Sequence, residues 1–146
     1  MEQQNQNTSK VKKIKLDFKD SKYATGRRKR SIAKVWVKKG SGNIHVNGLK
    51  MNEYFKRPVH QIIVTRPLEI SQVATSYDVK CSVKGGGLSG QAGAIILGIS
   101  KALIEEDGNL KKALKKDKLT TRDSRVVERK KYGHRKARRS FQFSKR

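Results

Sequence analysis

The C-terminal quarter of the chain cannot contribute much to a packed core. Residues 109–146 hold 16 of the 36 basic residues and only 3 of the 12 acidic ones, and apolar periodicity stops at Thr120. From Thr120 onward the chain buries too little apolar surface to offset its conformational entropy. We therefore expect it to be disordered alone and ordered only by a polyanion. The fold must be built by the residues that precede it.

The rest of the sequence divides into an extension and a domain. Residues 1–22 are polar and Lys-rich and contain no Arg, Gly or Pro, which predicts a disordered N-terminal extension. Residues 23–118 suffice for one small domain, and residues 119–146 form a basic tail. The net charge of +24 far exceeds the roughly 2–8 of an ordinary soluble domain, which indicates a polyanionic partner.

Several classes of protein are excluded by what the sequence lacks. The longest apolar run, around Ile95 to Leu97, is far shorter than the roughly 20 residues of a membrane-spanning helix. Cys81 stands alone, so there is no disulfide framework, and residues 1–22 hold no apolar block typical of a secretory signal. We expect a reducing, cytosol-like compartment and no membrane partner.

The first half of the domain predicts a hairpin followed by two helices. Residues 31–37 alternate as a strand, and a Gly-rich turn leads to a return strand at 44–46. Residues 49–55 predict a short helix. A second helix starts at Pro58, with Val59, Ile62 and Ile63 at helical spacing, and is broken by Arg66-Pro67.

The second half predicts one strand and one long helix. Residues 77–84 alternate apolar and polar side chains, as in a strand with one buried face. Ser89 is the expected N-cap of a helix that ends near Asp107, with Gly108 as its left-handed stop. A short helix around Leu114 follows. The apolar stripe of the long helix is expected at Ala92, Ile95, Ile96, Ile99, Ala102 and Leu103. The order of elements predicts an α+β fold, a small sheet with packed helices.

Enzymatic chemistry has little support. Cys81 lies on the apolar face of its strand, and His45, His60 and His134 have no partners at metal-ligand spacing. A glycine-rich loop between a strand and a helix also occurs in small-molecule kinases, but the Lys precedes the glycines and no G-x-x-x-x-G-K-[ST] is present. We expect no catalytic residue, no metal site and no cofactor.

Three basic or glycine-rich segments are the candidate binding sites. The loop 84–94 can bring its backbone and a helix N-terminus close to phosphate. Its many small residues exceed what a flexible turn with a capped helix would need, which favours phosphate contact over that alternative. The run 27–30 stands at the start of a predicted strand, which favours ordered phosphate contact over solvated charge or a localisation signal. The length of the basic tail from residue 120 to 146 favours threading through folded RNA over a nonspecific tail. Arg supplies bidentate phosphate contacts, and Tyr132, Phe141 and Phe143 offer stacking faces. The candidate residues for RNA are Arg27, Arg28, Lys29, Arg30, Lys84, Gly85, Gly86, Gly87, Ser89, Gln91, Arg122, Arg125, Arg129, Lys130, Lys131, Arg135, Lys136, Arg138 and Arg139.

The same segments resemble a known family. TGRRKRSIAKVWVKKGSG (25–42), VKGGGLSGQAGA (83–94), TRDSRVVERKKYG (121–133) and KARRSFQFSKR (136–146) are similar to the ninth protein of the small ribosomal subunit, of bacterial and organellar type. The resemblance covers residues 23–146 in the family's order. It implies a fold related to the second domain of the fifth small-subunit protein, with a left-handed crossover, which departs from the usual rule.

The resemblance also implies partners. The domain would bind small-subunit ribosomal RNA (rRNA) and neighbouring proteins in the subunit head, without forming a homo-oligomer. The tail would reach the anticodon stem-loop of the tRNA in the peptidyl (P) site through Ser144, Lys145 and Arg146. The expected location is the ribosome of the bacterial cytoplasm, with a mitochondrial matrix or plastid ribosome as the alternative. A free-standing nucleic-acid-binding protein, such as a nucleoid protein or RNA chaperone, is the other function considered.

Overall fold

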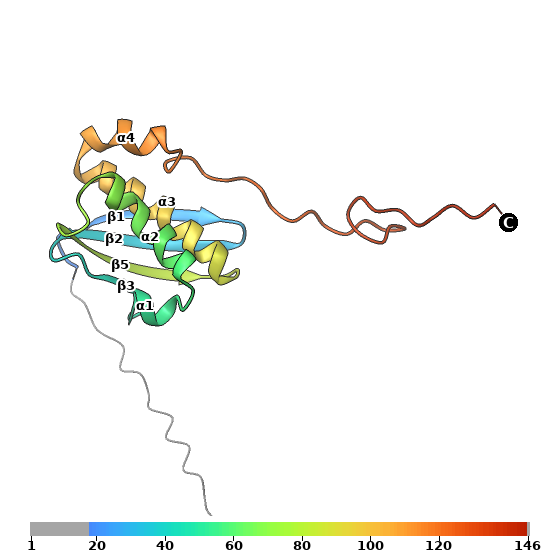
Figure 1. Ribbon diagram of the computed structural model, residues 1–146, viewed down its shortest axis with the longest axis horizontal. Coiled ribbons are helices and arrows are strands. Elements are labelled where there is room, and N and C mark those ends of the chain that lie inside the picture. Colours follow the sequence, from blue (N-terminus) through green and yellow to red (C-terminus); the bar gives the residue numbers. More distant parts are fainter. Residues whose placement is uncertain (1–17, 146) are drawn as a thin grey trace, which may run out of the picture.

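Five strands form one mixed sheet with the long helices α2 and α3 on one of its faces, which confirms the α+β class (Figure 1). The computed structural model describes residues 18–145. The strand order is β1-β2-β5-β3-β4, and every neighbouring pair is antiparallel except β3 and β5. In chain order the elements are β1 (Lys22–Arg28), β2 (Ser31–Lys39), β3 (Ile44–Val46), β4 (Leu49–Lys50), α1 (Met51–Tyr54), α2 (Pro58–Ile70), β5 (Tyr77–Lys84), α3 (Leu88–Glu106), the 3-10 turn η1 (Gly108–Leu110) and α4 (Lys111–Lys116).

The predicted hairpin of residues 31–37 and 44–46 is wrong. β2 pairs with β1 on one side and β5 on the other, while β3 lies on the far side of β5. Asp78 accounts for the difference, because its Oδ1 accepts the backbone N–H groups of Ser41 (3.0 Å) and Asn43 (2.8 Å). These bonds hold the turn at the start of β5, so the chain crosses β5 and does not fold back on β2.

β1 is a strand that the sequence pattern does not predict. It begins at Lys22, which the expected boundary assigns to the N-terminal extension. Ala24 and Gly26 face the core, and a Cβ on Gly26 would collide with the carbonyl of Ala94 in α3. Glycine is a poor strand former, yet here its missing side chain lets α3 pack directly on the β1 backbone.

β5 and α3 confirm their predictions. The odd-numbered residues of β5, from Tyr77 to Val83, are buried, and the residues between them are partly exposed. Ile96 is half-buried. The other five positions of the predicted α3 stripe are fully buried: Ala92, Ile95, Ile99, Ala102 and Leu103. Both elements form the core that positions the surface loops.

The predicted ends of α3 are partly wrong. Gly87, not Ser89, occupies the N-cap position, and no side chain caps this helix. At the other end Asp107 is the C-cap and its N–H bonds to the carbonyl of Leu103 at 2.8 Å. Gly108 begins η1 and does not have a positive φ. An extended C-cap residue therefore ends the helix without a left-handed glycine.

α2 continues through the predicted break at Arg66-Pro67. Pro67 lies in the helix and is buried beside Leu68, and its missing N–H removes only one helical hydrogen bond near the C-terminal end. The buried face also differs from the predicted one, because Val59 and Ile62 are 64% and 62% exposed. Burial of Pro67 and Leu68 sets the rotation of the helix.

Two short helices are confirmed in part. The predicted helix 49–55 begins as the strand β4, so that only Met51–Tyr54 is helical. The short helix near Leu114 is α4, and the Leu114 side chain is fully buried. Leu119 still packs on the core, with its N–H bonded to the carbonyl of Leu114 at 3.1 Å. The tail therefore leaves the domain just after the expected boundary.

Beyond Leu119 the chain first passes the domain surface, where Asp123 pairs with Arg28, and then runs away from the domain and forms a loop before its end (Figure 1). The handedness of the crossover between the parallel strands β3 and β5 stays a prediction, as does the state of the free tail. Residues 1–17 of the expected N-terminal extension lie outside the described residues. Among residues 18–145 no helix is both long and apolar enough to cross a membrane.

Candidate RNA interface

The turn between β1 and β2 packs against the glycine-rich loop that follows β5. The hydroxyl of Ser31, which is buried, donates a hydrogen bond to the carbonyl of Gly85 at 3.0 Å, across 54 residues of sequence. Two predicted binding segments thus form one surface. Arg28 and Gln91 are half-buried in it. Its exposed members are Arg27, Lys29, Arg30, Lys84, Gly85, Gly86, Gly87 and Ser89.

The protein's own packing requires two of the three consecutive glycines. Gly85 and Gly86 have φ angles of +75° and +62°, which favour glycine. A Cβ on Gly85 would lie 2.6 Å from the carbonyl oxygen of Arg30, and one on Gly86 would collide with Ser31 Oγ. A Cβ on Gly87 would meet nothing within 4 Å. Of these three glycines, Gly87 alone has open space where a side chain would be.

Gln91, a predicted RNA-binding residue, makes hydrogen bonds within the domain. Its Oε1 accepts the hydroxyl of Tyr54 at 2.7 Å, and its Nε2 donates to the carbonyl of Gly85 at 3.2 Å. The side chain therefore ties α1 to the glycine-rich loop. Its observed role is to hold the loop in place.

Arg28 connects β1 to the root of the tail. Its aliphatic stem passes over Gly93 of α3, where a Cβ would collide with Arg28 Cδ. Its Nη2 lies 2.9 Å from Asp123 Oδ2, which Arg125 also contacts at 2.9 Å. Hydrogen bonds from the Arg125 side chain and backbone, together with the charge of Arg28, hold the pKa of Asp123 well below its usual range. Asp123 therefore stays charged and joins the tail to the domain.

A cavity of about 760 Å³ opens where the tail leaves the domain. Among the described residues its wall contains one carboxylate, Asp123, and a rim of cations: Arg27, Arg28, Arg66, Lys115, Lys118, Arg122 and Arg125. Its apolar residues are Ile63, Ile96, Leu97 and Leu119. The excess of cations gives the cavity a positive electrostatic potential.

Sequence reasoning missed three of these cations. The sequence pattern marks Arg66 only as part of a predicted helix break, and it gives no reason to expect an RNA contact at Lys115 or Lys118. Tertiary packing brings α2, α4 and the tail root to the same cavity, and no local pattern of the sequence reports that proximity.

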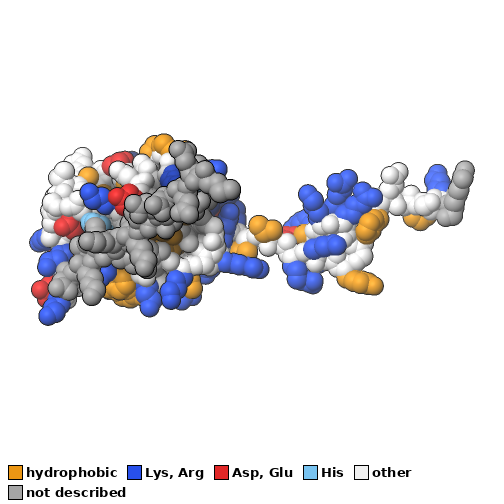
Figure 2. Space-filling model, turned by 90° about the horizontal axis from the view of Figure 1, so that it is seen from below, with side chains coloured by type: hydrophobic (Ala, Val, Ile, Leu, Met, Phe, Trp, Pro, Cys, Tyr) orange, Lys and Arg blue, Asp and Glu red, His pale blue; other side chains and the backbone are white. Residues whose placement is uncertain are grey.

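The tail contains a loop closed by its own contacts. Arg138 pairs with Glu128, with Nε donating to Oε2 at 2.9 Å, and the Arg135 N–H bonds to the Arg139 carbonyl at 2.8 Å. The Arg135 guanidinium lies 5.3 Å from the centre of the Phe141 ring. Figure 2 shows basic side chains on several sides of this loop. The exposed predicted residues here are Arg129, Lys130, Lys131, Arg135, Lys136, Arg138 and Arg139.

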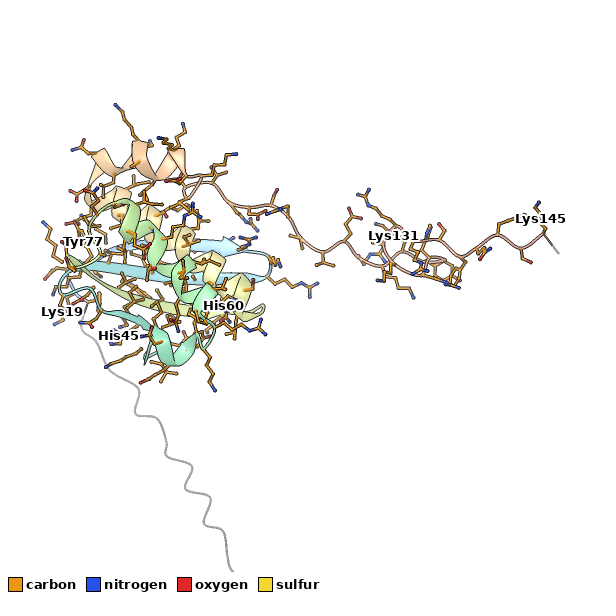
Figure 3. The ribbon with its side chains drawn as sticks, in the orientation of Figure 1. Lys19, His45, His60, Tyr77, Lys131 and Lys145 are labelled. Atoms are coloured by element: carbon orange, nitrogen blue, oxygen red, sulfur yellow. The ribbon has the colours of Figure 1, made fainter. Side chains whose placement is uncertain are left out.

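The end of the tail lies far from the domain. Figure 3 labels Lys131 in the loop and Lys145, the last described residue. Ser144 and Lys145 are exposed. Arg146, the third residue of the predicted tRNA contact, lies outside the described residues.

The residues that could support catalysis are dispersed. Cys81 is buried in β5, and burial raises the pKa of its thiol. His60 packs against Phe55, with ring centres 5.8 Å apart, whereas His134 lies in the tail loop beside Ser140. Within residues 18–145 no group of three or more His, Cys, Asp or Glu could hold a metal ion.

One comparison with known proteins identifies the family. A family model described as ribosomal protein S9/S16 matches residues 26–146, which include the β1–β2 turn, the glycine-rich loop and the whole tail. The chain belongs to this family. It is therefore a structural, RNA-binding protein of the small ribosomal subunit, and it takes part in translation as a component of that ribonucleoprotein. The family also implies association with small-subunit rRNA and with other ribosomal proteins.

Proposed function

We propose that the domain binds rRNA in the head of the small subunit and that the tail contacts the anticodon stem-loop of the P-site tRNA. The observation that carries this proposal is the shared cationic surface of the β1–β2 turn, the glycine-rich loop and the tail root, from which an exposed tail extends. Phosphate groups favour such clusters of Arg and Lys. The predicted rRNA contacts are those of the two loops and of residues 122–139.

The tip of the tail supplies the tRNA contact. Ser144 and Lys145 are exposed at the end of a segment that leaves the domain entirely. A cation at the end of such a segment can reach a phosphate far from the rRNA that holds the domain. The tail needs no chemistry of its own to do this, and we propose that the protein orients RNA without catalysing a reaction.

Contacts with neighbouring head proteins have a separate candidate surface. Val59 and Ile62 lie one turn apart on α2, and both side chains are more than half exposed. Apolar side chains in this arrangement suit a protein partner better than a phosphate backbone. The compartment, a bacterial cytoplasm or an organelle, stays a prediction.

Deletion of Ser144, Lys145 and Arg146 tests the tail assignment. We expect truncated subunits to assemble normally but to bind P-site tRNA about tenfold more weakly, because one or two charged hydrogen bonds are lost. The matched control is Lys111→Gln with Lys112→Gln, which removes two exposed cations from α4. Equal tRNA affinity of truncated and full-length subunits would refute the tail contact.

Sedimentation distinguishes a ribosomal protein from the alternative, a free-standing nucleic-acid-binding protein. A tagged copy should migrate with small subunits, and salt dependence alone cannot separate the two functions because both are electrostatic. A stable pool on DNA, away from subunits, would favour the alternative.

A further inference from the structure

The outer face of the sheet, defined as the face opposite α2 and α3, carries an aromatic and basic row. Side chains alternate along each strand, so the neighbours of the buried core residues point to this outer face. The strand register aligns one row across all five strands: Tyr23, Trp36, Lys80, His45 and Lys50. Both long helices pack on the opposite face, as Figure 1 shows.

The aromatic part of this row is held in place and accessible. The rings of Tyr23 and Trp36 lie 5.3 Å apart at 45°, and Tyr23 is 43% exposed. The Lys80 ammonium lies 5.8 Å from the Trp36 ring centre and 5.7 Å from that of Phe18. Two rigid rings next to a cation form a surface on which a planar group can stack.

The outer face also carries positive charge. Lys34 and Lys38 flank Trp36 on β2 and are exposed. The acidic residue on the same face of β5 is Asp78, whose Oδ1 already accepts two backbone N–H groups of the 41–43 turn. The exposed charge that Lys34 and Lys38 give this face is cationic, and it complements a polyanion.

The outer face is continuous with the interface described above. At one end of the outer face, Arg27 of β1, Ile32 of β2 and Lys84 of β5 are aligned in register. This row lies directly beside the β1–β2 turn and the glycine-rich loop. An RNA strand held at those loops can continue along the sheet without leaving cationic surface.

We propose that the outer face is a stacking platform for an unpaired stretch of RNA. A base stacks on Tyr23 and Trp36, and the flanking phosphates contact Lys34 and Lys38. Sheets that carry exposed aromatic residues among basic ones bind single-stranded RNA in this way, with sequence-tolerant stacking. The proposal rests on the proposed function, since it adds an RNA contact to the same protein.

The chain's own N-terminus is the competing occupant. Phe18 already lies beside Lys80, and residues 1–17 precede it. Those residues contain four lysines and two acidic residues, so their net charge does not complement a cationic face. Charge complementarity therefore favours RNA.

Trp36 supplies a direct measurement, because it is the only tryptophan in the chain. The full-length protein is titrated with an end-labelled single-stranded RNA 20-mer, and binding is followed by anisotropy of the label. Trp36 emission is measured in parallel with unlabelled RNA. We expect RNA to quench Trp36 over the same concentration range as it binds, because stacked bases quench indole fluorescence.

Matched variants separate stacking from general charge. Tyr23→Ala should weaken RNA binding about tenfold, the effect of one stacked base, while Tyr23→Phe, which keeps the ring, should bind like the wild type. Lys112→Gln on α4 removes an exposed cation away from the outer face and should leave the quenching unchanged. Melting curves of each variant show whether it is folded.

Three outcomes would overturn the platform. In the first, RNA binds with normal affinity but does not quench Trp36, and Tyr23→Ala binds as tightly as the wild type. This result would place the RNA elsewhere on the protein and leave the proposed function intact. In the second, deleting residues 1–17 changes Trp36 emission, while RNA does not change the emission of the full-length chain. This result would assign the outer face to the N-terminus. Absence of any RNA binding would contradict both proposals.

Discussion

Replacing Gly86 with alanine should destabilise the domain for a reason that lies within the protein. At φ +62° an alanine is in the left-handed region, which costs about 1–2 kcal/mol. Its Cβ would also collide with the hydroxyl of Ser31, which is buried and bonded to the carbonyl of Gly85. Loss of that hydrogen bond adds about 1 kcal/mol.

The two contributions amount to about 2–3 kcal/mol. For a domain of this size that corresponds to a fall in melting temperature of roughly 10–20 °C. Urea or thermal unfolding of the free protein, followed by circular dichroism, measures it. The same substitution in a Ser31→Ala background isolates the collision: there Gly86→Ala should cost only the positive φ, because the hydroxyl and its hydrogen bond are already absent.

Gly87→Ala is the control. Gly87 has φ −102°, and a Cβ there meets nothing within 4 Å, so the free energy of unfolding should change by less than about 0.5 kcal/mol. Equal destabilisation by alanine at Gly86 and Gly87 would refute the assigned contact with Ser31. A Gly87→Ala protein of normal stability that binds rRNA more weakly would identify Gly87 as the position of close RNA approach.

Three further perturbations test other contacts. Asp123→Asn should barely change the melting temperature, because an exposed ion pair contributes little to stability. It should nevertheless speed tryptic cleavage at Arg122 and Arg125, because the tail root is no longer held against the domain. An unchanged cleavage rate would contradict that attachment. Burial and the hydrogen bond to the Asp107 carboxylate raise the pKa of Tyr77 to about 12, so the stabilisation from its neutral hydroxyl is complete below pH 10 and declines from pH 10 to 12. Over that range the free energy of unfolding of the wild type should fall by up to about 2–3 kcal/mol more than that of Tyr77→Phe. Parallel stability curves for the two proteins would contradict this. Cys81 should resist alkylation at pH 8 in the native protein and react on unfolding, so rapid native modification would show that β5 opens.

Local patterns were sufficient for several elements. The alternation of Tyr77 to Val83 predicts β5, and the 3.6-residue spacing from Ala92 to Leu103 predicts α3, because in each case the buried face is defined within one segment. The composition of residues 120–146 likewise predicts a segment outside the core, and the described residues of this segment are mostly exposed. The cationic candidates at the two loops follow from composition as well, although their contacts with RNA stay predictions.

Elements that depend on distant partners could not be predicted in this way. The pairing of β3 with β5 depends on Asp78 holding a turn that lies 35 residues earlier in the chain. The rotation of α2 depends on burial of Pro67, and the exposure of Val59 follows from it. Neither effect leaves a periodic signal in its own segment.

The sequence alone determined that this chain has a small core, a long basic tail and loops suited to phosphate, since composition and periodicity are local properties. Only the tertiary structure decided which of these parts meet. It showed that Gly86 faces Ser31, that Arg28 pairs with Asp123, and that Arg66 joins a cavity at the tail root. Each of these contacts joins residues far apart in the chain, and packing of the whole domain is required to bring them together.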